Sequence, residues 1–446
     1  MFQGRFIQSG LRKVLASRSA LAYLALLLAV FAFLPGAAYA GSLLVAVIVL
    51  LGWREMRYVP RGVFLVACCG LVYAVLRDVS LIPDAAANVT RLAGLILAVM
   101  LLSIVLGRSR DLQRISVSLF GGKPLTRYLS LAFGTALVSI PLNFGSVAVV
   151  GSLVGERIRA GGDSPATRNA TRAVLRGFGT APSFSPLSIS VVLTLTLLPG
   201  LPSGHLIAAA LPFAVLMVFL GVIWREPEAA DQPVIRDEPA NIGSWLRFGG
   251  LIVAICTGVF VLSHAYGVSY AHAVTLSCLA VVIGARLLAW SRGENPPMAS
   301  MDRVSNELAI VGGSAFIGAI ISGVVLGEIQ GSVSPPDWAW PLLAALVPWT
   351  FFVAGLSGIN PIVIGTLIGG ILGSIWPSEA LLGLGVGMVT GWGITAFGTP
   401  FAANALIMER LTGYRARDAS LRWSLALSFT GLAVASMLAA SLTLLG

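Results

Sequence analysis

The chain has 446 residues, of which 57% are hydrophobic and 11% are charged, and its net charge is +10. Soluble domains carry roughly 25% charged residues, so the composition excludes a chain that mostly faces water and predicts a membrane protein without a separate soluble domain. The basic residues are spread between apolar segments, which indicates membrane loops and no nucleic-acid partner. All four cysteines lie inside apolar runs without metal-ligand spacing, which excludes a disulfide framework and a zinc site.

The N-terminal segment allows two interpretations. Basic residues, among them Lys13 and Arg18, precede an apolar run over 21–34, and the small-x-small sequence AYA follows at 38–40. This is the form of a cleavable signal peptide. The alternative is a retained transmembrane helix within 1–36 that turns directly into a second one. We prefer retention, because polytopic bacterial proteins usually insert through their first helix, and we expect a cytoplasmic N-terminus.

Apolar segments follow one another along the rest of the chain, and eleven of them, counting the first, have the length of a single membrane span. They lie at about 20–35, 37–53, 62–77, 90–107, 174–198, 205–224, 246–266, 269–291, 306–327, 380–404 and 423–445. This pattern predicts an all-α polytopic membrane protein.

Two further segments, 129–155 and 338–376, are too long for one span, and Pro and Gly residues interrupt each near its middle. Asn143 lies at the first interruption and Asn360 at the second. Non-helical backbone at membrane depth is tolerated only where it is buried in protein or lines a cavity. We therefore predict two re-entrant hairpins with these asparagines at their tips.

The distribution of charge supports the hairpins. If the N-terminus is inside and each hairpin returns to its starting side, 27 of the 29 Lys and Arg residues fall in inside loops. Only Arg77 and Arg91 fall outside. A simple crossing at either hairpin would invert every later loop. The first hairpin then has both ends in the cytoplasm, and the second has both ends in the periplasm.

Hairpins of opposite entry are typical of inverted repeats. Asn143 and Asn360 are 217 positions apart, and the Gly-Thr-Ala-Pro sequence at Gly179 is matched by Gly-Thr-Pro at Gly398 with a similar offset. We therefore predict two inverted repeats within four parts of the chain. These are an N-terminal transmembrane helix at 1–36, repeat 1 at 37–225 with the cytoplasmic-side hairpin, a cytoplasmic linker at 226–245, and repeat 2 at 246–446 with the periplasmic-side hairpin.

A helix rich in Gly and Pro follows each hairpin, with a predicted break at 177–186 and at 391–400. Pro removes a backbone donor and Gly lets the backbone unwind, so carbonyl oxygens become free to bind a cation beside neutral hydroxyl and amide oxygens. Helix packing is the alternative role of any single Ser or Thr. The predicted substrate- and ion-binding residues are Asn143, Gly145, Ser146, Thr180, Pro182, Ser183, Ser185, Asn360, Pro361, Thr366, Thr395, Thr399, Pro400 and Asn404.

Almost no Asp, Glu or Lys lies in the middle of a predicted span, which disfavours a proton relay. Sodium held by neutral oxygens, with Asn143 and Asn360 among its ligands, is the predicted coupling ion, and no other cofactor is expected. Arg168, Arg172 and Arg176 share one helix face before the first break. They either attract an anion at the cytoplasmic mouth or, as we prefer, anchor the cytoplasmic side.

The order of spans and hairpins, with Asn143 and Asn360 at the tips, resembles the ion transporter superfamily, and most closely the divalent anion/sodium symporter family. That family has Ser-Asn-Thr motifs at both tips. Here only the central Asn matches, because Leu142 and Phe144 replace the flanking Ser and Thr at the first tip, and Ile359 and Pro361 do so at the second. The first hairpin keeps a Ser two residues after Phe144, at Ser146. The resemblance implies sodium sites at the tip asparagines, a substrate between the tips, a dimer and elevator motion. The membrane subunit of tripartite ATP-independent periplasmic transporters shares the architecture and would need a periplasmic binding protein.

We therefore expect a sodium-coupled secondary transporter of a small organic anion, a carboxylate, acting as a homodimer in the bacterial inner membrane. An enzyme is not expected, because no convergent set of acid, base or nucleophile is visible. The alternatives are the membrane subunit of a tripartite transporter and a lipid-handling flippase or exporter. A channel fits less well, since hairpins of opposite entry suit alternating access better than a continuous pore.

Overall fold

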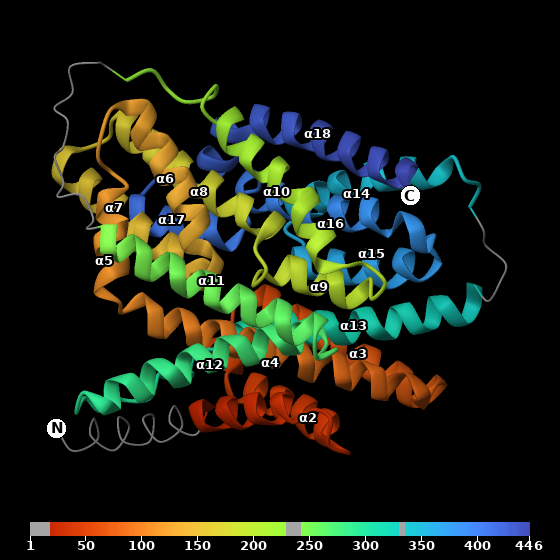
Figure 1. Cartoon of the computed structure of the whole chain (residues 1–446). Helices are drawn as coiled ribbons and strands as arrows, with labels where there is room; N and C mark the ends of the chain where they lie inside the picture. The colour runs from red at the N-terminus through yellow and green to blue at the C-terminus, as the bar shows by residue number, and fades with distance from the viewer. Residues whose placement is uncertain (1–17, 229–241, 330–334) are drawn as a thin grey trace. The chain divides into compact units, whose positions relative to one another are not determined.

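The structure, a computed structural model, describes residues 18–228, 242–329 and 335–446. These residues form helices and connecting segments, and no strand occurs among them (Figure 1). The first 17 residues of the predicted 1–36 helix and residues 229–241 of the predicted linker lie outside the described residues. The all-helical fold predicted from the composition is confirmed.

The chain divides into two compact units. Unit 1 contains the described residues up to Leu102 and those of Val259–Gln330, and unit 2 contains Ser103–Gly258 and Gly331–Gly446. Each unit therefore draws on both predicted repeats. Two of the boundaries fall inside helices, α4 and α11, which each continue from one unit into the other.

Unit 1 is built around α13, which packs against α2 and α3. Its helices are one over Arg18–Val30, α2 (Ala37–Leu51), η1 (Trp53–Glu55), α3 (Tyr58–Arg77), η2 (Val79–Leu81), α4 (Ile82–Gly107) as far as Leu102, the end of α11, α12 (Tyr270–Ser291) and α13 (Ser305–Ile329). The first of these helices is packed into the unit. A Cβ added at Gly94 of α4 would lie only 2.3 Å from the Cβ of Ala29.

Unit 2 is built around α16, and all but two of the eighteen residues of that helix are buried. It packs against α8, α14 and α18 (Figure 1). The unit contains α5 (Arg110–Ser118), α6 (Pro124–Leu142), α7 (Phe144–Gly161), α8 (Pro165–Phe184), α9 (Ile189–Leu197), α10 (Ser203–Leu220), most of α11 (Ile242–His264), α14 (Ala339–Leu356), α15 (Pro361–Ile375), η3 (Ser378–Ala380), α16 (Leu381–Gly398), α17 (Ala403–Thr412), the π-helical turn η4 (Asp418–Arg422) and α18 (Trp423–Leu445).

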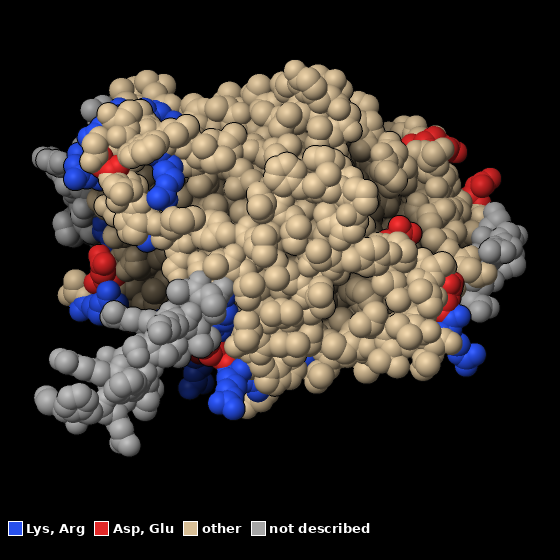
Figure 2. All heavy atoms as spheres, turned by 90° about the horizontal axis from the view of Figure 1, so that it is seen from below, with Lys and Arg blue, Asp and Glu red and all other residues tan. Residues whose placement is uncertain are grey.

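Eleven of the described helical segments are long and apolar enough to cross a membrane, as predicted, although the set differs. It includes α6 and α14, the first arms of the predicted hairpins. The described helices over Arg18–Val30 and Ala37–Leu51, which we expected to cross, are shorter. In the view of Figure 2 most of the surface carries no Lys, Arg, Asp or Glu, as a chain surrounded by lipid requires.

Candidate substrate and cation site

The predicted first hairpin consists of α6 and α7, which are joined by Asn143 alone. Asn143 has φ 48° and ψ −125°, and it is the only non-glycine residue with positive φ in the described part of the chain. Such a conformation stores strain unless the surroundings fix it, and strained residues concentrate at functional sites. The predicted break is confirmed, but both arms are longer than the predicted 129–155.

Four hydroxyl groups gather behind this tip. Ser139 and Ser146 share a hydrogen bond with 2.6 Å between their Oγ atoms, and Ser146 is 2.7 Å from the carbonyl oxygen of Asn143. Ser103 donates to the carbonyl oxygen of Leu142 at 2.9 Å. Thr135 is fully buried, and its hydroxyl has no partner among the described residues. The cluster offers several neutral oxygens in one place, which is the donor set a sodium ion requires.

Close packing maintains this cluster. A Cβ added at Gly145 would lie 2.6 Å from Oγ of Ser103, so glycine at this position lets the hairpin approach α4. Pro141 lies in the last turn of α6 and cannot donate to the carbonyl of Leu137, which is therefore left without its helical partner. Of the cluster, the sequence predicted Gly145 and Ser146 beside Asn143, and it missed Ser103, Thr135 and Ser139.

The tip of the second hairpin has a different chemistry. Asn360 precedes Pro361, the first residue of α15, and its Oδ1 accepts a hydrogen bond from the Ile362 amide at 2.9 Å. It is therefore an N-cap. Thr366, one turn further on, donates to the carbonyl of Ile362 at 2.9 Å. The break is confirmed, but the side chain of Asn360 caps the start of α15, whereas the side chain of Asn143 makes no hydrogen bond to a described residue.

The two predicted helix breaks are present but start later than expected. The residues from Gly177 remain helical to Phe184, and those from Gly391 remain helical to Gly398. The unwound segments are 185–188, between α8 and α9, and 399–402, which contains Pro400, between α16 and α17. Pro182 lies in the final turn of α8, so it deprives only the carbonyl of Phe178 of its helical donor, and the helix ends two residues later.

Most of the predicted hydroxyl groups use their proton within their own helix. Thr180 donates to Gly177, Thr395 to Gly391, and Thr399 to Thr395, each at 2.8 Å. The Asn404 amide likewise donates to the carbonyl of Ala396 at 2.8 Å. A hydroxyl has one proton and two lone pairs, so these oxygens remain able to bind a cation but cannot donate to an anion.

Ser185 is the exception at the first break. Its side chain is 1% exposed, and its hydroxyl has no partner among the described residues. The neighbouring Pro182 carbonyl accepts hydrogen bonds from Ser188 and Ser190 instead. A buried hydroxyl without a partner costs about 1–3 kcal/mol, so its retention at a helix break suggests a ligand.

The two broken helices cross where each has a glycine five residues before its end. A Cβ on Gly179 would lie 2.6 Å from Cδ1 of Phe397, and a Cβ on Gly393 would lie 2.5 Å from Oγ of Ser183. Gly393 and Phe397 each follow their counterparts Gly179 and Ser183 by 214 positions. The two contacts are therefore the same contact with the two segments exchanged.

The same exchange recurs where each hairpin meets a broken helix. A Cβ on Gly155 of α7 would lie 2.2 Å from the carbonyl oxygen of Leu411 in α17, and one on Gly369 of α15 would lie 2.7 Å from Cδ1 of Leu197 in α9. These pairs are again 214 positions apart. Contacts that repeat with exchanged partners are the pattern of two segments related by a two-fold axis.

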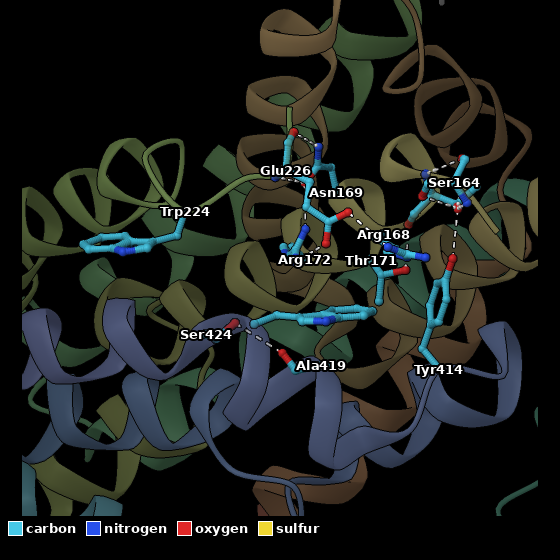
Figure 3. A network of polar contacts seen from close by, with 12 residues as sticks. Ser164, Arg168, Asn169, Thr171, Arg172, Trp224, Glu226, Tyr414, Ala419 and Ser424 are labelled. Carbon is cyan, nitrogen blue, oxygen red and sulfur yellow. Dashed lines mark hydrogen bonds and ion pairs between the residues drawn. The ribbon is translucent and has the colours of Figure 1, made fainter. Parts of the chain in front are cut away.

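A network of charges surrounds the start of α8 (Figure 3). Arg172 donates to Glu226 at 2.7 Å and stacks on the ring of Trp423 at 4.7 Å, and Asn169 donates to the carbonyl of Glu226 at 2.8 Å. Arg176 is 1% exposed and donates to five backbone carbonyl or side-chain oxygens. These arginines are already paired, so the geometry supports the anchoring role and not attraction of an anion.

The network extends to the segment before α18. Tyr414 donates to Asp163 at 2.6 Å, and Asp163 also pairs with Arg168. The hydrogen bonds from Arg168 and Tyr414 hold the pKa of Asp163 below its ordinary value. Burial, together with the bond to Asp163, raises the pKa of Tyr414 to about 12. Glu228, paired with Arg127 at the start of α6, completes the connection between hairpin 1 and the rest of unit 2.

Comparison with known proteins leaves the family open. No family model matches the chain, and no curated protein matches it. Among solved structures, the chain is similar to the YdaH transporter of Alcanivorax borkumensis, whose crystal structure is described as having an unusual topology. The two are 15% identical, the match covers 81% of this chain and 88% of that one, and the TM-score is 0.50. The likeness shows a fold found in a membrane transporter, and it does not single out the divalent anion/sodium symporter family.

Proposed function

We propose that the protein is a secondary transporter that couples sodium to the movement of a small organic anion, a carboxylate. The observation that supports this proposal most is the hydroxyl cluster behind Asn143. Ser139, Ser146 and the Asn143 carbonyl place neutral oxygens within hydrogen-bond distance of one another, and α6 contains no Asp or Glu. Such a site can bind a cation without a titratable group that takes up or releases a proton.

The substrate carboxylate needs hydrogen-bond donors, and few groups near the breaks have a proton that they do not already donate to a backbone carbonyl. We assign this role to the Ser185 hydroxyl and the Asn143 amide, because neither donates to a described residue. The remaining hydroxyls at the breaks donate to backbone carbonyls, as Ser183 does to Val389 of α16, and can only accept. We therefore propose that the anion binds beside the first break and that the second break binds cations or hydrogen-bond donors of the substrate.

The proposed mechanism is elevator-type alternating access by two inverted repeats. Every residue of the predicted site lies in unit 2, and none lies in unit 1. This division supports unit 2 as the moving part and unit 1 as the scaffold. The exchanged contacts at an offset of 214 support the repeats. A homodimer in the bacterial inner membrane, with a cytoplasmic N-terminus, belongs to the same proposal.

The test is the thermal stability of the purified protein in sodium and in potassium, with a panel of carboxylates. A ligand that binds only the native state raises the apparent stability by mass action. We expect one carboxylate to stabilise the protein only in sodium. The Ser146→Ala variant should need at least about tenfold more sodium for the same shift, which corresponds to about 1.4 kcal/mol.

Ser152→Ala is the matched control, because Ser152 lies on the same helix and donates only to the carbonyl of Val149. It should respond to sodium as the wild type does. Equal sodium responses of the Ser146 and Ser152 variants would refute the site. A wild-type protein that responds to no carboxylate in either salt would refute the anion and would favour a partner-dependent or lipid transporter.

A further inference from the structure

Unit 1 contains a cavity of about 400 Å³ that belongs to no part of the proposed transport site. Its lining includes Arg18, Gly52, Glu55, Arg303, Ser305 and Asn306. Gly52 follows α2, Glu55 precedes α3, and Ser305 is the first residue of α13. The cavity therefore lies beside the starts of two candidate membrane spans, α3 and α13, where lipid headgroups are expected.

Arg18 makes the cavity unusual. Its side chain is 1% exposed, and its Nη2 donates to both carboxylate oxygens of Glu55 at 2.9 and 3.0 Å. Its Nε is buried and has no partner among the described residues. A buried guanidinium donor without an acceptor is costly, so an acceptor from a ligand would complete its hydrogen bonding.

The packing around Arg18 leaves no room for a larger residue at Gly52. A Cβ added there would lie 2.1 Å from Oγ of Ser305 and 3.3 Å from Nη1 of Arg18. Ser305 in turn donates to the carbonyl of Ile48 at 3.0 Å. The end of α2 and the start of α13 are therefore held together beside the buried arginine.

The charge of the lining favours an anion. Two guanidinium groups, those of Arg18 and Arg303, face one carboxylate, that of Glu55. Arg303 is exposed and forms no ion pair or hydrogen bond with a described residue. The N-terminus of α13 adds a positive partial charge.

We propose that this cavity binds the phosphate group of a phospholipid headgroup. The oxygens of a phosphate match forked guanidinium donors and the free amides of a helix N-terminus. A lipid is favoured as its source, because only 11% of the residues in the apolar window of α3, the helix that starts at Tyr58 beside the cavity, are buried, which leaves this candidate span free to contact lipid. The acyl chains would then lie in the bilayer while the phosphate enters between the helix ends.

The experiment measures thermal stability of the delipidated full-length protein during titration with three probes. They are phosphatidylglycerol, diacylglycerol with the same acyl chains, and soluble glycerol phosphate. The Arg303→Gln variant removes an exposed arginine of the cavity, and Arg292→Gln removes an exposed arginine elsewhere in the same loop. Because both side chains are exposed, both variants should fold.

Phosphatidylglycerol should stabilise the wild type and the Arg292 variant equally, and the Arg303 variant should need about tenfold more of the lipid. Diacylglycerol should have no such effect. An equal response of all three proteins, or an equal effect of diacylglycerol, would overturn the phosphate site. Saturation by glycerol phosphate at the concentration at which the lipid acts would overturn the lipid as its source. The sodium response that depends on Ser146 should persist in the Arg303 variant, so the two proposals fail separately.

Discussion

Asn143 and Asn360 both interrupt a hairpin, yet their backbones and side chains differ in ways that mutation can separate. Asn143 has a φ of 48°, which glycine adopts without strain, while Asn360 accepts a hydrogen bond as a cap. We predict that Asn143→Gly is at least as stable as the wild type but loses transport. Asn143→Ala should be less stable than the glycine variant by about 1 kcal/mol or more.

Asn360→Ala is the comparison for this prediction. Loss of the cap should cost about 1 kcal/mol of stability, while sodium-dependent transport remains. Thermal denaturation and uptake into proteoliposomes measure the two properties. Normal transport by Asn143→Gly would show that the conformation of the tip, and not the side chain, is what the site requires.

Asp111 of α5 makes the stability of the protein depend on pH in the acid range. The hydrogen bond from Arg247 is the main cause that lowers the pKa of Asp111 to about 2. A carboxyl whose pKa is lowered by folding contributes stability above its ordinary pKa and loses it as pH falls through the folded value. Wild-type stability should therefore fall between about pH 4 and pH 2 more than that of Asp111→Asn. The difference should shrink in high salt, because the Arg247 side chain is 61% exposed.

Single residues of the candidate site were only partly predictable. Asn143 and Ser146 lie beside Pro141 and Gly145, which predict a break in an apolar run. Ser103, Thr135 and Ser139 carry no such mark, because an isolated Ser or Thr in a membrane helix is common and its partner is decided by packing. Ser103 meets the Leu142 carbonyl across 39 positions, and nothing local specifies that contact.

The crossing of α8 and α16 depends on two glycines. A Cβ on Gly393 would lie 2.7 Å from the carbonyl oxygen of Gly179, and backbone atoms cannot rotate away as a side chain can. We predict that Gly393→Ala lowers the free energy of unfolding by about 1–3 kcal/mol. Gly249→Ala in α11 is the control: no atom lies within 4 Å of its added Cβ, so that variant should be neutral or slightly more stable. Equal melting temperatures of the two variants would contradict this close crossing.

Helix ends were predicted less well than helix breaks. The first hairpin begins at Pro124 and ends at Gly161, beyond the predicted 129–155. The apolar pattern ends where polar residues begin, but the helices continue, because Arg127 and its ion pair with Glu228 satisfy the charge. We predicted the break after α8 too early, because Pro182 lies in the last turn of that helix and does little to unwind the residues before it.

Within unit 2, the pair Arg172 and Glu226 joins α8 to the segment after α10. The Arg172 side chain is 6% exposed and that of Glu226 is 30% exposed, so water screens the pair only partly. We predict that Glu226→Gln lowers the free energy of unfolding by about 2–3 kcal/mol. The double variant Arg172→Met, Glu226→Leu should recover part of this loss, because no unpaired charge remains buried. A double-mutant cycle of Arg172→Met, Glu226→Leu and their double variant, followed by thermal denaturation, measures the coupling, and additive single effects would refute it.

At the scale of the whole chain, the sequence predicts the repeated order of elements but not their register. The landmarks in the sequence are 217 to 219 positions apart, whereas the exchanged contacts of glycines in unit 2 are 214 apart. By that register Asn143 corresponds to Ser357, and Asn360 to Ser146. Close contacts at a few glycines fix the alignment of one repeat on the other. From the sequence alone, these glycines cannot be told apart from the rest of the 50 glycines of the chain. Nor do the repeats coincide with the compact units, since each unit draws on both.

The central position of α16 has a consequence for how the protein is made. Translation proceeds from the N-terminus, so α8 leaves the ribosome about 200 residues before the helix that covers its Gly179 face. Until then, the face of α8 that contains Gly179, and the arginines Arg172 and Arg176, remain exposed to lipid or to the insertion machinery. About the last seventh of the chain thus completes the core of unit 2, and a ribosome that stalls before residue 381 would leave a membrane-inserted but unfinished protein for quality control to remove.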